Sequence, residues 1–291
     1  MNRLNQTKIL MWMLSLCMAF ALASCESDVH ESEHGGLSVE LEWQDAVEPA
    51  AIKSIYLWIY NAADGTLVKE RQFSNARQLA SERYQLPAGN YKVVAAVNLD
   101  APFSASGTTG AETLLFTLPD ASASPAHVYY AVADATVSNA DDVTVVTEQL
   151  GMVMAELTLT VNNAPASSVL TGTLTNAAEG FLPVKSQTND LATTVTLPST
   201  SAQGTAIQVP TLRLMPTAYG KDKTVLTLQL TDADGHVSDF DIVAPVMKAG
   251  NKYEITLDYR TMQARMALST CVINPWTEGW TYNGEVLNPE N

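Results

Sequence analysis

An alternation of apolar and polar residues with a period of two is the feature that most constrains the fold of this chain. Beyond residue 36 the alternation recurs almost throughout, and it is clearest in the segments 37–43, 157–161, 226–230 and 253–259. Successive side chains of a strand point to opposite faces, so each segment buries one face and exposes the other. Clusters of Asn, Gly, Pro, Ser and Asp separate these segments. The sequence therefore predicts an all-β fold built of sandwiches.

A weak internal repeat divides the chain into two halves. In each half a strand runs into Ala-Asp-Gly, a strong hairpin signal, and later Ala-Gly-Asn leads into a second apolar strand. The matching segments are 54–68 with 224–237 and 86–98 with 247–259. We therefore predict two related tandem domains, residues 37–149 and residues 150–291.

The N-terminus, residues 1–24, has the layout of a bacterial secretory signal. Arg3 and Lys8 precede an apolar run that ends in Leu-Ala-Ser-Cys, which resembles a lipoprotein processing site. We predict cleavage between Ser24 and Cys25 and acylation of the Cys25 thiol, which gives a stable membrane anchor. An ordinary cleaved signal peptide and an uncleaved anchor remain as alternatives.

Residues 25–36 are expected to form an acidic tether. They contain the motif H-E-x-x-H at 30–34, but Gly35 and Gly36 follow at once and would end the helix that a zinc protease needs. We therefore expect no metal there. The acidic residues after Cys25 resemble the export signal that sends lipoproteins of the Bacteroidota to the cell surface. The predicted location is the outer membrane, with the protein lipid-anchored and exposed outside the cell.

Composition excludes several classes of function. The net charge is −15 at pH 7, which disfavours nucleic-acid binding because phosphates require clustered Lys and Arg. Of the three cysteines, Cys17 leaves with the signal and Cys25 is acylated, so Cys271 has no partner for an internal disulfide and is expected to be a buried apolar residue.

No motif of the chain predicts catalysis. The sequence contains no G-x-S-x-G, no phosphate-binding loop and no C-x-x-C. Asp232-Ala-Asp234-Gly235 resembles part of a calcium loop but lacks its later ligands, so we interpret it as a hairpin turn. We expect a protein that is not an enzyme and that has no cofactor and no metal.

Five aromatic residues are candidates for a binding platform. On the strand at 54–60, the face opposite the core residues carries a row of rings, and two Trp residues follow near the C-terminus. These residues are Tyr56, Trp58, Tyr60, Trp276 and Trp280. The row of three can stack on a sugar or receive a partner strand, or it can lie beneath a second layer of the same domain. We favour the second layer.

The order of these segments resembles the fimbrillin superfamily of Bacteroidales, the lipoprotein precursors of type V pili. The segments are LSVELEW, IKSIYLWIYNAADGTLV, LPAGNYKVVAAVNLD, GMVMAELTLTV and INPWTEGW, behind the lipoprotein site and tether. The chain is most similar to the FimB-type anchor and minor subunits. This resemblance implies two transthyretin-like β-sandwich domains and a role in fimbrial assembly or attachment, with other fimbrial subunits as partners.

The resemblance also separates two kinds of subunit. Stalk fimbrillins are cut at an Arg in the loop after the first strand, which releases that strand and opens a groove for a neighbour's strand. Here the corresponding loop, residues 44–51, contains no Arg or Lys, and none occurs between Cys25 and Lys53. We therefore expect the first strand and the lipid to stay. Cleavage at Arg71 or Arg77, which the sequence places in a polar loop at 69–79, remains an alternative.

The sequence thus predicts a lipid-anchored fimbrial anchor or minor subunit that takes part in pilus assembly and adhesion. Two alternatives remain open. One is a surface lipoprotein that binds glycan through the aromatic residues, and the other is a stalk subunit that a protease processes.

Overall fold

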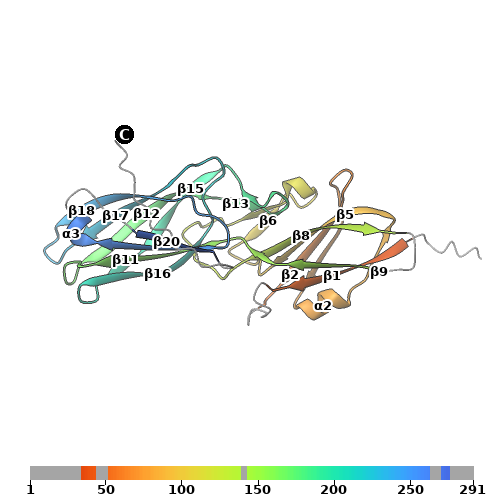
Figure 1. The fold of residues 1–291 in the computed structure, drawn as a ribbon, viewed down its shortest axis with the longest axis horizontal. Helices are drawn as coiled ribbons and strands as arrows, with labels where there is room; N and C mark the ends of the chain where they lie inside the picture. Colours follow the sequence, from red (N-terminus) through yellow and green to blue (C-terminus); the bar gives the residue numbers. More distant parts are fainter. Residues whose placement is uncertain (1–33, 44–51, 139–142, 263–269, 276–291) are drawn as a thin grey trace, which may run out of the picture.

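The structure is a computed structural model that describes residues 34–43, 52–138, 143–262 and 270–275. Cys25, Trp276 and Trp280 lie outside the described residues. The molecule is elongated, with the strands of the first half gathered at one end and those of the second half at the other (Figure 1). Within the described part of the chain no helix is long and apolar enough to cross a membrane.

The first half forms a sandwich of two sheets. Its smaller sheet has the order β4 (Tyr84–Pro87), β1 (His34–Glu42), β9 (Val143–Gln149). Its larger sheet has the order β10 (Gly151–Met152), β8 (Tyr129–Val137), β5 (Gly89–Val97), β2 (Ile55–Asn61), β3 (Leu67–Phe73). Apolar side chains from both sheets fill the space between them, including Leu37, Val39, Ile55, Leu57, Val93 and Val146. A short helix, α2 (Ala76–Ser81), connects β3 to β4.

The second half forms another sandwich of two four-stranded sheets. One has the order β16 (Ala206–Leu214), β11 (Ala155–Asn162), β19 (Asn251–Asp258), β20 (Thr270–Pro275). The other has the order β15 (Ala192–Ser201), β12 (Val169–Ala178), β17 (Thr224–Thr231), β18 (Val237–Ala244). The alternating Leu, Ile and Val residues of β11, β17 and β19 fill its core, and α3 (Tyr259–Met262) follows β19. The predicted all-β sandwich class is confirmed.

One arrangement recurs in both halves. The first strand of each half pairs in parallel with a later strand, β1 with β9 and β11 with β19, in sheets whose other pairs are antiparallel. Parallel pairs need a long connection, so in each half the first strand lies beside a strand that follows much later in the chain. The division at residue 149 stays a prediction. Leu150 belongs to the first core, and its N–H donates to the Glu42 carbonyl.

A third layer connects the halves. A small sheet has the order β14 (Gln187–Thr188), β13 (Gly180–Leu182), β7 (Leu115–Thr117), β6 (Ser104–Ser106), with short 3₁₀ turns at Ala111–Thr113 and Pro183–Lys185. Because β7 comes from the first half and β13 from the second, their pairing crosses between them. Beneath it lies a third apolar cluster that includes Trp58, Tyr60, Phe116, Met154 and Phe181.

Candidate functional site

Strand β1 is the element that connects the predicted tether to the fold. It occupies the centre of its sheet, antiparallel to β4 over 34–37 and parallel to β9 over 36–42. Leu37 and Val39 point into the first core, where both are almost fully buried. Removal of β1 would leave two unpaired strand edges and uncover apolar side chains. The same removal would open a groove between β4 and β9.

The strand begins at His34, whereas the sequence placed residues 34–36 in the tether. Gly35 and Gly36 pair with Leu86 and Gln85 instead of ending the structure. A Cβ atom at residue 36 would lie 2.3 Å from the Arg83 Nε atom, so Gly36 allows this side chain to pass over the strand. Gly36 thus accommodates a close approach within a strand, although the flexible Arg83 side chain could also shift to admit a Cβ atom.

The aromatic row of β2 is covered. Trp58 and Tyr60 are 1% and 0% exposed, and the Trp58 ring centre lies 6.0 Å from that of Phe116 in the third layer. The Trp58 Nε1–H donates to Glu70 Oε1 at 3.0 Å, and the Tyr60 hydroxyl donates to the Thr108 carbonyl. Burial raises the pKa of Tyr60. An exposed platform made of Trp58 and Tyr60 is therefore wrong for this structure, because stacking on a sugar needs an open ring face.

Tyr56 is the only half-buried ring of that row. It stacks on Trp58 with ring centres 5.8 Å apart, and its hydroxyl donates to Asp100 Oδ1 at 3.0 Å. Burial and the Asp100 carboxylate raise the pKa of Tyr56. Gln72 donates to the same hydroxyl oxygen. These polar contacts tie the ring to its neighbours, so Tyr56 also has a structural role.

A charged cluster lies between the approach to β8 and the second sandwich. Glu156 of β11 has a side chain that is 13% exposed, and its carboxylate contacts three basic side chains. Its Oε1 atom lies 2.9 Å from His127 Nε2 and 3.4 Å from Arg213 Nε, and its Oε2 atom lies 3.2 Å from Lys252 Nζ. Burial raises the pKa of Glu156, but the hydrogen bonds from His127 and Lys252 hold it below its ordinary value. Burial lowers the pKa of His127 despite the carboxylate.

The Asp232–His236 segment is a turn between β17 and β18, as the sequence predicted. Asp232 Oδ1 accepts the N–H groups of Asp234 and His236, and the Asp232 N–H donates to the His236 carbonyl. Gly235 has a φ of +84°, which suits glycine. Three potential ligand atoms of this turn lie within 4.8 Å of one another, but turn formation accounts for that proximity.

The alternative cleavage residues lie in regular structure. Arg71 belongs to β3, where it pairs with Leu57, and Arg77 belongs to α2. The polar loop expected at 69–79 is therefore wrong for these two residues. Charged residues are common on an edge strand, where they discourage pairing between molecules. A protease that cuts at Arg71 must first break the ladder between β2 and β3.

Comparison with protein families assigns the chain. Residues 25–282 match the family described as "Fimbrillin-A associated anchor proteins Mfa1 and Mfa2". The chain belongs to this family. The resemblance to fimbrillins that the sequence indicated is thereby confirmed. A search of curated protein sequences found no match.

Solved structures share the fold. The chain is similar to the fimbrial anchor protein Mfa2 from Porphyromonas gingivalis, with a TM-score of 0.58, 15% identity, and coverage of 86% of this chain and 100% of that one. It is similar to putative polysaccharide binding proteins from Bacteroides thetaiotaomicron, with a TM-score of 0.58, 11% identity and coverage of 89% and 99%. A fimbrial assembly protein from Parabacteroides distasonis gives a TM-score of 0.52 at 12% identity, over 86% and 99%. At these identities the likeness shows the fold alone.

Proposed function

We propose that this protein is a lipid-anchored anchor or minor subunit of a surface fimbria, and that it keeps strand β1 throughout its life. The observation that carries the proposal is the central place of β1 between β4 and β9. Membership of an anchor-protein family supports the fimbrial role. The protein acts by binding other subunits and the membrane, without catalysis and without a cofactor.

The position of β1 couples the membrane to the first sandwich. Cys25 carries the lipid, and residues 26–33 connect it to His34, the first residue of the strand. A force on the pilus then passes through the hydrogen bonds of β1 with β4 and β9. Because the β1–β9 pairing extends from Gly36 to Glu42 along parallel strands, a pull along the strand loads several bonds together.

Retention of β1 agrees with the sequence around it. No Arg or Lys occurs between Cys25 and Lys53, so a protease that cuts after Arg has no site within the strand or in the loop of residues 44–51. This separates the protein from a stalk subunit, which must lose its first strand. The glycan-binding alternative loses its main support, since Trp58 and Tyr60 are buried.

Replacement of Cys25 tests the anchoring role. A Cys25→Ala chain cannot be acylated, so we expect the protein to leave the outer-membrane fraction while its fold is retained. Fimbriae that depend on it are then expected in the culture medium. A Cys17→Ala chain is the matched control, because that residue lies in the signal. Full membrane retention of the Cys25→Ala chain would contradict the proposal.

A further inference from the structure

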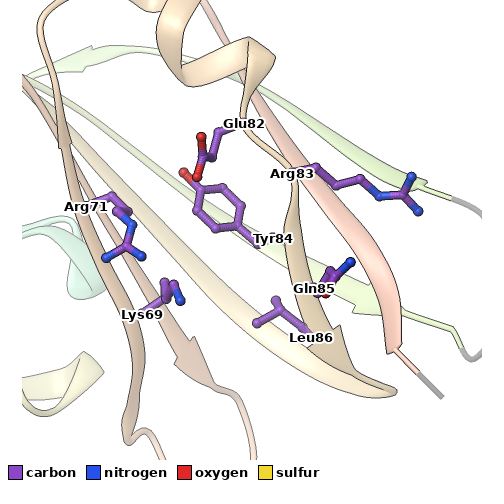
Figure 2. Close-up of a pocket in the computed structure, with 7 residues that line it drawn as sticks. All are labelled: Lys69, Arg71, Glu82, Arg83, Tyr84, Gln85 and Leu86. Carbon is purple, nitrogen blue, oxygen red and sulfur yellow. The ribbon is translucent and has the colours of Figure 1, made fainter. Parts of the chain in front are cut away.

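A basic pocket lies at the open edge of the first sandwich. It has a volume of about 360 Å³ and lies between β3 and β4, the edge strands of the two sheets. Lys69 and Arg71 of β3 form one wall, and Glu82, Tyr84 and Leu86 form the other (Figure 2). This size falls at the lower end of the range of small-molecule sites.

Two cations share the pocket wall because of the strand period. Lys69 and Arg71 are two residues apart, so both point to one face of β3. They pair with Ile59 and Leu57, whose side chains belong to the first core, so this face borders the core. Among the described residues neither cation forms an ion pair, and Arg71 donates only to the neighbouring Glu70 carbonyl.

The wall opposite Lys69 and Arg71 holds a buried hydroxyl. Tyr84 is 3% exposed, and within the described part of the chain its hydroxyl has no hydrogen-bond partner. Figure 2 shows the ring directed across the pocket, with the hydroxyl between Glu82 and Arg71. A buried donor without an acceptor is costly, and an acceptor placed there would satisfy it. Arg83 extends away from this space, across Gly36.

From this arrangement we infer that the pocket binds a small-molecule oxyanion, with a phosphate or sulfate group as the best match. Two cationic side chains facing one space attract a doubly charged group, and the planar guanidinium of Arg71 can donate two hydrogen bonds to a pair of its oxygens. The Tyr84 hydroxyl supplies a further donor once the exposed Glu82 side chain turns aside. The inference is independent of the fimbrial role.

Phosphate binding by the full mature chain tests the inference. Inorganic phosphate is titrated into the Cys25→Ser protein at constant ionic strength, and heat of binding and Tm are measured. We expect saturable binding that raises Tm. Lys69→Gln and Arg71→Gln should each weaken it about tenfold through loss of a charge-assisted hydrogen bond. Glu82→Gln should strengthen it, because the opposing carboxylate is removed.

Two further variants separate a site from a general charge effect. Lys92→Gln removes the same charge at a residue that pairs with Asp134 outside the pocket, so phosphate affinity should not change. Tyr84→Phe keeps the ring and removes the hydroxyl, so phosphate affinity should fall while the phosphate-free protein keeps its stability. The inference is overturned if no saturable binding occurs, or if Lys92→Gln lowers affinity as much as Arg71→Gln. It is also overturned if Tyr84→Phe and Glu82→Gln destabilise the phosphate-free protein equally, since Glu82 would then be the partner of the hydroxyl.

A vesicle-binding experiment distinguishes a lipid headgroup from a free small molecule as the source of the phosphate group. Phosphatidylcholine vesicles with and without phosphatidic acid are mixed with the same protein and sedimented. Binding that needs phosphatidic acid, Lys69 and Arg71 supports the oxyanion site and assigns a lipid headgroup. Saturable binding of inorganic phosphate without vesicle binding supports the site and assigns a free small molecule.

Discussion

His127 Nε2 lies 2.9 Å from Glu156 Oε1, and this contact connects the approach to β8 with the first strand of the second sandwich. Arg213 and Lys252 pair with the same carboxylate from the two strands that flank β11. The pKa values of both His127 and Glu156 are lowered, so this contact makes the stability of the protein depend on pH.

We predict that acidification destabilises the protein in two steps. Since the pKa of His127 is lowered by burial, the unfolded chain takes up this proton first, and stability falls as pH drops below the ordinary value of 6.5. The lowered pKa of Glu156 adds a loss below its ordinary value of 4.5. Urea unfolding between pH 8 and pH 4 measures both. His127→Gln should flatten the first step, whereas His236→Gln, on a side chain 79% exposed, should not.

Removal of the Glu156 charge should also destabilise the protein at neutral pH. Glu156→Gln removes the charge that pairs with Arg213 and Lys252, whose side chains are 37% and 45% exposed, so we expect a cost of about 1–2 kcal/mol. Urea unfolding measures the difference. Glu254→Gln on the exposed face of β19 is the control, and we expect a change within about 0.5 kcal/mol there. Equal effects of the two variants would contradict the structural role of the cluster.

Trp58 should contribute strongly to the unfolding free energy of the protein. Trp58→Ala removes a fully buried ring that packs on Phe116, so we expect a loss of about 3–5 kcal/mol of unfolding free energy. Tyr56→Ala, at the half-buried neighbour, should cost less. Thermal unfolding of both variants checks this order. A stable Trp58→Ala protein would mean that the third layer does not cover the ring.

Strand β1 should contribute to stability through its buried face. Leu37→Ala is expected to cost about 2–5 kcal/mol, because the side chain is fully buried in the first core. Glu40→Ala, on the exposed face of the same strand, should change stability by less than about 0.5 kcal/mol. Urea unfolding of the Cys25→Ser protein measures both. If Leu37→Ala were as mild as Glu40→Ala, β1 would not be an integral strand.

The strands of the core were predictable from the sequence, because burial on one face imposes a period of two. Leu157, Leu159 and Val161 alternate with Thr and occupy the interior as expected. The same rule placed Tyr56, Trp58 and Tyr60 on one face but did not say what covers that face. Its cover, the strand containing Phe116, follows far later in the chain and pairs with Phe181 from the other half.

Two features that involve charged residues were not predictable from the sequence. Strand β3 spans Leu67–Phe73, yet its polar residues from Lys69 onward suggested a loop, because an edge strand can carry charge where a central strand cannot. The cluster around Glu156 was not predictable either. Its partners come from three distant segments, and Glu156 itself resembles any polar residue that alternates with apolar ones. Such sites form from side-chain contacts between distant segments, so the local sequence pattern does not predict them.

The mass of the intact protein, isolated from the bacterial surface with its N-terminus defined, tests the central claim most directly. We predict a single uncut chain that begins at acylated Cys25, includes β1 and extends to residue 291. A lipid-free chain that begins after Arg71 or Arg77 would contradict the claim, because the protein would then be a processed building block of the pilus and not its retained anchor.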